Sequence, residues 1–152
     1  MENKFITFNE RKIPLYHDYR PMYKVSIILL ILHYNGFAGK ASLLKLHLFS
    51  WSLKSKQNLK VLEDYAMSSN DGKMLFFGIE STLNRALNLA YAEKLVDFEN
   101  GSYKLRDKGK KFALEIDKDK ELFIEEKSAL KKIGKKLNEN KISNLINEWK
   151  NA

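Results

Sequence analysis

The chain has 152 residues, enough for one domain of ordinary size or for one domain with a helical extension. Its 44% hydrophobic residues and its few prolines and glycines (two and seven) argue against a disordered chain. The net charge of +8 favours an acidic partner, such as nucleic acid or an acidic protein surface, and the absence of cysteine excludes disulfides and thiolate metal sites.

The first part of the chain predicts an arm followed by a buried helix. Residues 1–20 sustain neither helical nor strand periodicity, so we expect an arm or edge strand that lies on the domain. Pro21 suits the first turn of a helix, and the apolar run from Tyr23 to Tyr34 predicts a helix that ends in a left-handed residue at Asn35-Gly36. No apolar run approaches the roughly 20 residues of a membrane span, and none resembles a signal peptide, so we expect a soluble, cytoplasmic protein.

Two further helices are expected before the middle of the chain. Lys40 to Leu53 is too rich in leucine for a single apolar stripe, which predicts a second well-buried helix with Lys45, His47 and Ser50 on its outer face. A third helix follows Ser55, since apolar residues recur there at three to four positions. A loop over residues 68–72 and a short strand over residues 74–77 come next.

The next segment predicts a helix, a hairpin and another helix. Ser81 is placed to cap the first of these helices, and Asp107 to cap the second. Between them, Val96 and Phe98 alternate against Tyr103 and Leu105, and Asn100-Gly101 suits a type I′ turn. The first helix has an apolar face made of Leu83, Ala86, Leu87, Ala90 and Tyr91.

The C-terminal part predicts one long helix or two abutting helices, over residues 121–138 and 141–150, with a kink or close contact at Gly134. The order of elements is that of a winged-helix domain. The expected fold is therefore mainly α with a small β-hairpin wing. It divides into an N-terminal arm (1–20), a winged-helix-like domain (21–117) and a C-terminal helical extension (118–152).

Residue patterns typical of catalysis are not found. The three histidines share no spacing suited to a metal ion, and the adjacent carboxylates lie in polar stretches among lysines. The sequence contains neither a glycine-rich phosphate loop nor a serine in the setting of a nucleophile. We therefore expect no catalytic, metal or cofactor-binding residues, no cofactor, and a protein that is not an enzyme.

Basic residues around the hairpin are the candidates for nucleic-acid contact. A wing that presents lysines can hold a phosphate backbone, although a solvated face that keeps the protein soluble explains the same residues equally well. The helix over residues 81–93 carries a single cation, and the segment 52–79 replaces the short turn of a helix-turn-helix. Both observations favour protein docking over base reading. The nucleic-acid candidates are Lys104, Arg106, Lys108, Lys110, Lys111 and Arg85.

Several segments resemble the middle components of bacterial ABC-three-component systems, to which the Lamassu type is similar. The resemblance is carried by residues 41–55 (ASLLKLHLFSWSLKS), 83–90 with 93–96, 103–110 and 133–136, in the order of that family. It implies a small non-catalytic subunit that works with an SMC- or Rad50-like ABC ATPase and a separate effector, often a nuclease, in defence against phage or plasmids. The weakly charged helix at 81–93 departs from what direct DNA contact would require.

Two hypotheses follow. The first is an adaptor that docks on an SMC-like ATPase, with DNA contacted through the complex or weakly by this chain. The second is a stand-alone winged-helix DNA-binding transcriptional regulator, which the basic wing supports. Under the first hypothesis we expect some apolar residues to remain half exposed until a partner covers them, unless they fill the core of the chain itself. These interface candidates are Trp51, Leu89, Leu130, Ile133 and Leu137.

Overall fold

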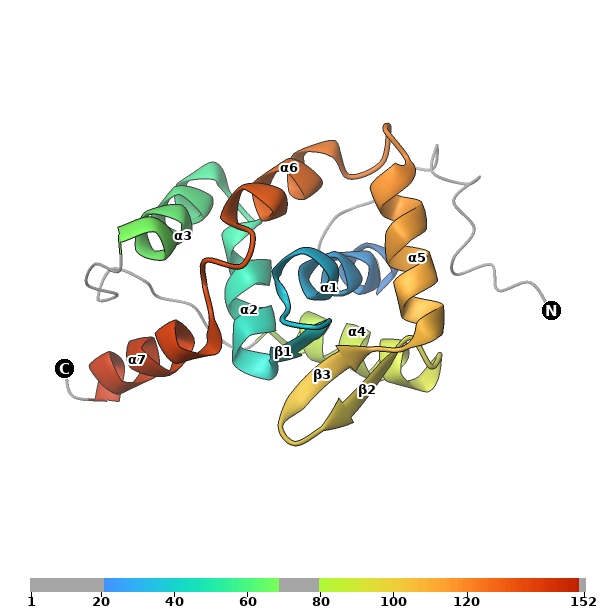
Figure 1. Cartoon of the computed structure of the whole chain (residues 1–152), viewed down its shortest axis with the longest axis horizontal. Coiled ribbons are helices and arrows are strands. Elements are labelled where there is room, and N and C mark those ends of the chain that lie inside the picture. The colour runs from blue at the N-terminus through green and yellow to red at the C-terminus, as the bar shows by residue number, and fades with distance from the viewer. Residues whose placement is uncertain (1–20, 69–79, 151–152) are drawn as a thin grey trace.

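The computed structural model describes residues 21–68 and 80–150. Within these ranges the protein is mainly helical with a small antiparallel sheet, as predicted (Figure 1). The predicted arm (1–20) and strand (74–77), and most of the loop over 68–72, lie outside the described residues. The elements are α1 (Pro21–Asn35), β1 (Lys40–Ser42), α2 (Leu43–Ser52), α3 (Lys56–Ser68), α4 (Ser81–Ala92), β2 (Val96–Glu99), β3 (Ser102–Leu105), α5 (Asp107–Lys118), α6 (Ile124–Ile133) and α7 (Glu139–Lys150).

The sheet has the strand order β1-β3-β2. The predicted hairpin is confirmed: Val96 pairs with Leu105 and Phe98 with Tyr103. The turn residues Asn100 and Gly101 both have positive φ (54° and 78°), as a type I′ turn requires. Strand β1 was not predicted, because three residues without alternation look like the start of the following helix. It exists because it pairs with β3.

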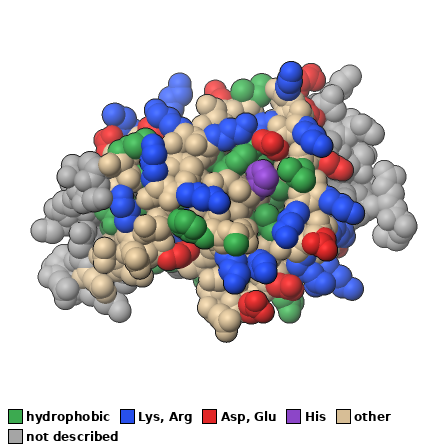
Figure 2. All heavy atoms as spheres, viewed as in Figure 1, with side chains coloured by type: hydrophobic (Ala, Val, Ile, Leu, Met, Phe, Trp, Pro, Cys, Tyr) green, Lys and Arg blue, Asp and Glu red, His purple; other side chains and the backbone are tan. Residues whose placement is uncertain are grey.

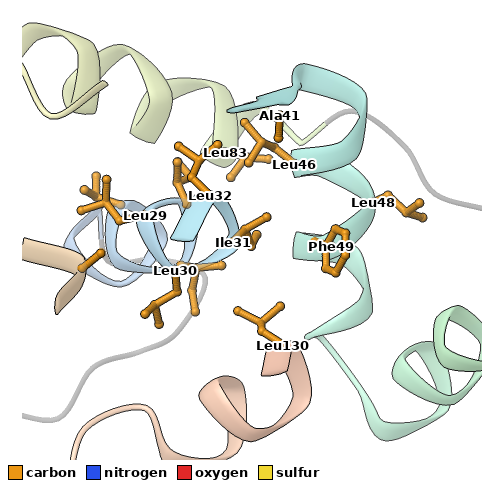
Figure 3. Close-up of a cluster of buried hydrophobic side chains, with 14 of the residues drawn as sticks. Leu29, Leu30, Ile31, Leu32, Ala41, Leu46, Leu48, Phe49, Leu83 and Leu130 are labelled. Atoms are coloured by element: carbon orange, nitrogen blue, oxygen red, sulfur yellow. The ribbon is translucent and has the colours of Figure 1, made fainter. Parts of the chain in front are cut away.

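Helix α1 lies at the centre of the core. It is buried on every side from Tyr23 to Leu32, which explains why its sequence is apolar all round rather than striped. It packs against α2, α4, α5 and α6. Figure 3 shows Leu83 from α4, Phe49 from α2 and Leu130 from α6 approaching the leucine-rich middle of α1.

Some helix ends differ from the prediction. Asn35 and Gly36 do not have positive φ; Ala38 and Gly39 do. Gly36 is required for space, since a Cβ there would lie 2.7 Å from the carbonyl oxygens of Leu32 and Lys40. Ser81 and Asp107 are the first residues of their helices and not the caps, which are Glu80 and Arg106. Asp107 still places a negative charge in the first turn of α5, where it stabilises the helix by interacting with the positive end of the helix dipole.

The outer face predicted for the second helix is wrong. Lys45, His47 and Ser50 are buried, because the elements around α2 cover it on both sides and leave no solvent-facing stripe. Tyr91 is also misplaced: it is 56% exposed, whereas the other four residues predicted for the apolar face of α4 are buried. Leucines occur on several sides of α2, so its sequence has no apolar stripe from which the buried face could be predicted.

The C-terminal part forms two helices, which resolves the alternative left open by the sequence. Gly134 ends α6 with a positive φ of 56°, and the chain then turns before α7 begins. The Asn35 side chain donates to the carbonyl oxygens of Leu130 (2.9 Å) and Gly134 (2.7 Å), so α1 holds this helix end in place. No helix in the described ranges has both the length and the apolar character to cross a membrane.

Candidate functional site

A buried polar network anchors the N-terminus of α4. The Glu80 carboxylate lies 2.8 Å from Lys54 Nζ, and it accepts a hydrogen bond from Ser50 Oγ at 3.0 Å. Lys24 Nζ donates to the same serine at 3.0 Å and lies 3.5 Å from Glu80. Burial raises the pKa of the Glu80 carboxyl, but the two lysines and the serine outweigh it and leave this pKa lowered. Since the carboxylate is used here, it does not cap its own helix.

His47 connects this network to the first turns of α4. Its Nδ1 accepts from the Glu80 backbone N–H at 3.2 Å, so the neutral ring carries its proton on Nε2. Nε2 lies 3.1 Å from Asn84 Oδ1 and donates to it. Burial lowers the pKa of His47, which keeps the ring neutral. Asn84 is therefore held by the protein interior and is not free to read a base.

The solvent-facing side of α4 is nearly uncharged. It presents Arg85, Asn88 and Tyr91, and Arg85 is its one cation. Leu89 is half-buried against the core. Arg85 has no acidic partner in the part of the chain that the structure describes. A helix with one cation supplies little of the phosphate attraction on which nucleic-acid affinity depends.

Two of the predicted basic residues of the hairpin are paired with acids of the same chain. Arg106 lies 3.4 Å from Asp97, and Lys108 lies 3.8 Å from the Glu93 carboxylate while donating to the Glu93 carbonyl oxygen at 3.0 Å. These pairs are solvent-exposed and weak. They nevertheless reduce the positive charge beside the C-terminus of α4.

The other three basic candidates of this region, Lys104, Lys110 and Lys111, lie on the sheet and on α5. Lys110 and Lys111 are exposed in the first turns of α5 and lack an acidic partner among the described residues. Lys104 alternates with Tyr103 and Leu105 along β3, so it lies on the outer face of the sheet, opposite Lys40 of β1. The structure therefore does not gather the six nucleic-acid candidates into one patch.

The apolar interface candidates divide into two groups. Trp51 and Leu89 are half-buried and pack on the edge of the core. The expectation of exposure for Leu130, Ile133 and Leu137 is wrong, because all three are 0% exposed. They fill the space between α1, α3 and the turn after α6, where the stripe that looked free in the sequence is covered by the chain itself.

Exposed aromatic residues were missed by the sequence reasoning. Phe98 on β2 is 51% exposed, and its ring centre lies 4.7 Å from that of Tyr103 on β3. Tyr91 on α4 is a second exposed aromatic residue, and α4 and β2 are in contact. We use the name α4–hairpin face for the exposed residues Arg85, Asn88, Tyr91 and Phe98 of these two elements. Val96 begins β2 in the core, and Phe98 lies two residues further along, near the Asn100-Gly101 turn, where the strand is exposed.

A groove of about 650 Å³ runs between α6 and the junction of α2 with α3. Two of its three acidic groups are partnered: Glu126 accepts from Tyr23 Oη at 3.1 Å, and Glu63 lies 3.6 Å from Lys132 Nζ. A carboxyl pair in unlike environments, as acid–base catalysis needs, is not formed by these residues. Within the described ranges no three His, Asp or Glu side chains are grouped so that they would hold a metal ion.

Comparison with protein-family models, with curated proteins and with solved structures gave no match.

Proposed function

We propose that the chain is a non-catalytic adaptor subunit that docks on an SMC- or Rad50-like ABC ATPase in an anti-phage or anti-plasmid defence complex. A separate effector, such as a nuclease, completes the complex. The resemblance of residues 41–55, 83–90 with 93–96, 103–110 and 133–136 to the middle components of ABC-three-component systems supports this proposal. In this proposal the protein acts in the cytoplasm, without a cofactor.

The fold that we propose for this subunit is a winged-helix-like domain over residues 21–117 with a C-terminal helical extension. The order α1-β1-α2, then α4-β2-β3, supports the assignment, and so does the position of β1 beside β3. In it, α4 takes the place of the helix that reads DNA in DNA-binding members, and the β2–β3 hairpin is the wing. Helix α3 is then an insertion between the two helices of the helix-turn-helix.

The observation that carries the docking proposal is the character of the α4–hairpin face. Tyr91 and Phe98 are 56% and 51% exposed, while the neighbouring cations Arg106 and Lys108 contact acids of the same chain. Aromatic residues are enriched where proteins dock, and they contribute much of the binding energy there. A face that is aromatic and nearly neutral suits a protein partner better than it suits a phosphate backbone.

A pull-down from the native host tests this assignment. Tagged wild-type protein should recover an SMC-like ATPase in near-stoichiometric amount, as identified by mass spectrometry at moderate salt. The double variant Tyr91→Asp with Phe98→Asp should lose it, because two charges would be buried in the interface. Leu114→Asp with Met67→Asp, at two exposed positions on other elements, is the matched control. An ATPase retained by the first variant, or absent from the wild-type sample, would contradict the proposal.

A stand-alone winged-helix DNA-binding transcriptional regulator is the second candidate. The side chains of Arg85, Lys110 and Lys111 favour it, since they have no acidic partner within residues 21–68 and 80–150 and would be available to phosphates and bases. It requires tight, sequence-dependent duplex binding by the purified protein that is lost on changing Arg85 and Asn88 to alanine. Binding that is blind to sequence would exclude it.

A further inference from the structure

A rigid turn presents Phe37 at the surface between α1 and β1. The backbones of Phe37 and Lys40 exchange two hydrogen bonds, of 3.1 and 3.0 Å, across Ala38 and Gly39, which both have positive φ. The Gly39 carbonyl oxygen also accepts from the Leu105 N–H at 3.0 Å, which ties the turn to β3. Phe37 is 47% exposed as a result.

An ammonium group lies buried beneath this ring. Lys45 is 0% exposed, and its Nζ has no hydrogen-bond partner among the described residues. It lies 5.2 Å from the centre of the Phe37 ring, and the Nζ of Lys135, which follows α6, lies 5.8 Å from the same centre. A buried ammonium without a hydrogen bond is unfavourable unless an anion comes near. Burial accordingly lowers the pKa of Lys45, with Glu139 acting in the opposite direction.

Two more lysines face each other beside the same turn. Lys40 of β1 and Lys104 of β3 are direct partners in the sheet register, so their side chains leave the same face at neighbouring positions. Like charges placed directly opposite each other destabilise a strand pair. Asp97 is the register partner of Lys104 on the other side, but its carboxylate contacts Arg106 at 3.4 Å. An anion placed beside Lys40 and Lys104 would therefore stabilise this strand pair as well.

We infer that the accessible lysines at this turn, Lys40, Lys104 and Lys135, bind the phosphate backbone of duplex DNA, and that the buried Lys45 adds its charge from beneath them. We call the surface the lysine face and define it as Phe37, Lys40, Lys45, Lys104 and Lys135. One acid, Glu139, lies near Lys45, and it already accepts a hydrogen bond from the Ser42 N–H at 3.1 Å. A phosphate group here offsets the repulsion between Lys40 and Lys104, and it attracts the buried Lys45 ammonium through space without contacting it. Figure 2, which looks onto the side of the molecule away from α4, shows basic side chains spread across this view.

Nucleic acid fits this surface better than an acidic protein does. A protein interface has an apolar centre, and Phe37 is the one large apolar side chain of the lysine face. Its ring is flanked by the ammonium groups of Lys45 and Lys135, at 5.2 and 5.8 Å from its centre, so it is surrounded by positive charge and not by further apolar side chains. Lysines act as point charges that hold phosphates without reading sequence, and such contacts need no apolar centre. The inference does not depend on the docking proposal.

Fluorescence anisotropy with a labelled 20-base-pair duplex, from 50 to 200 mM NaCl, tests the inference. Changing Lys40, Lys104 and Lys135 together to glutamine should weaken binding at least about tenfold. The slope of the logarithm of the binding constant against the logarithm of the salt concentration should become less steep by about 0.9 for each lost phosphate contact. The control changes Lys56, Lys60 and Lys120, which are exposed on α3 and after α5, to glutamine. It removes the same net charge and should bind as the wild type does.

Four results would overturn the inference. These are no duplex binding by the wild type at 50 mM NaCl, unchanged binding by the lysine-face variant, equal weakening by the control variant, and competition by polyglutamate as effective as by unlabelled duplex. Effective competition by polyglutamate would assign the surface to an acidic protein. Equal weakening by the control variant would mean that binding depends only on the net charge of the protein.

Lys45 is tested separately, because it contacts no solvent. Lys45→Met should weaken duplex binding by roughly two- to tenfold through loss of a nearby positive charge. The salt dependence should stay that of the wild type, since a buried ammonium displaces no counterion. Wild-type affinity in this variant would show that Lys45 has no part in the site.

Discussion

The buried Lys45 ammonium is an unfavourable feature of the isolated protein. Lys45→Met keeps a long unbranched side chain and removes the unpartnered polar atom. We expect the free energy of unfolding to rise by about 1–3 kcal/mol, as measured by urea denaturation. Lys135→Met, at an exposed position, should change it by less than about 0.5 kcal/mol. A destabilised Lys45→Met protein would mean that the ammonium has a partner outside the described residues.

His47 makes stability depend on pH. Burial lowers its pKa in the folded protein, whereas the unfolded chain titrates near 6.5. Just below pH 6.5 the unfolded state therefore binds more protons than the folded state, and stability falls as pH falls. Protonation of Nδ1 also removes the acceptor for the Glu80 N–H. Lys24 adds repulsion and Glu80 attraction, but burial is the largest effect.

Urea denaturation at pH 7.5 and 5.5 measures this effect. The wild type should lose stability over that range, and His47→Gln should show a flatter pH dependence whatever its absolute stability. Glu80 does not obscure the comparison, because its lowered pKa moves its own loss of stability below pH 4.5. Parallel pH dependences in the two proteins would assign the titration to another group.

At the scale of elements, α5 depends on one close approach to the end of α4. A Cβ at Gly109 would lie 2.1 Å from the Leu95 carbonyl oxygen, which accepts a hydrogen bond from the Arg106 N–H at 2.9 Å. Because the obstacle is backbone, Gly109→Ala must push α5 away from the hairpin. We expect a loss of at least about 2 kcal/mol in thermal or urea unfolding, in spite of the better helix propensity of alanine.

The neighbouring Lys110→Ala is the control for this change, since Lys110 is exposed and should tolerate it within about 0.5 kcal/mol. A neutral or stabilising Gly109→Ala would mean that α5 is able to shift without cost. The close contact matters for the proposed site because α5 continues directly from β3, the strand that carries Lys104.

At the scale of the whole molecule, the exposed Phe98 and the paired lysines Lys40 and Lys104 leave opposite faces of the sheet. The α4–hairpin face exposes Tyr91 and Phe98, and α4 lies behind α1 in the view of Figure 1. An adaptor with two separate faces is able to hold DNA and a protein partner at the same time.

This separation predicts independent effects. Tyr91→Ala with Phe98→Ala adds no charge and should leave duplex affinity within about twofold of the wild type, because Phe98 leaves the hairpin on the face opposite to Lys104. The lysine-face variant should still recover the ATPase. Anisotropy and the pull-down, each run on both variants, measure this. If either variant lost both activities, the two faces would be one site or the variant would be misfolded, and circular dichroism separates these cases.

Local sequence patterns were sufficient to predict most helices and the hairpin. The i, i+4 recurrence of Phe112 and Ile116 in α5, the apolar run of α1 and the Asn100-Gly101 turn depend on neighbouring residues alone, so they are readable without a fold. The basic hairpin residues were also identified correctly as exposed, although Lys104 is only partly so.

Contacts between distant segments decided the rest. Helix α2 has leucines on several sides, so its sequence pattern does not predict that Lys45 and His47 are buried. They are buried because the surrounding helices cover α2. Leu130, Ile133 and Leu137 looked like a free stripe until α6 packed on α1. The pairing of Lys40 with Lys104 exists because β1 joins β3 across a long stretch of chain. The sequence by itself determined which segments are helices and where the hairpin turns, since these depend on local backbone preferences. Which lysines meet, and which one is buried, was decided by tertiary packing alone.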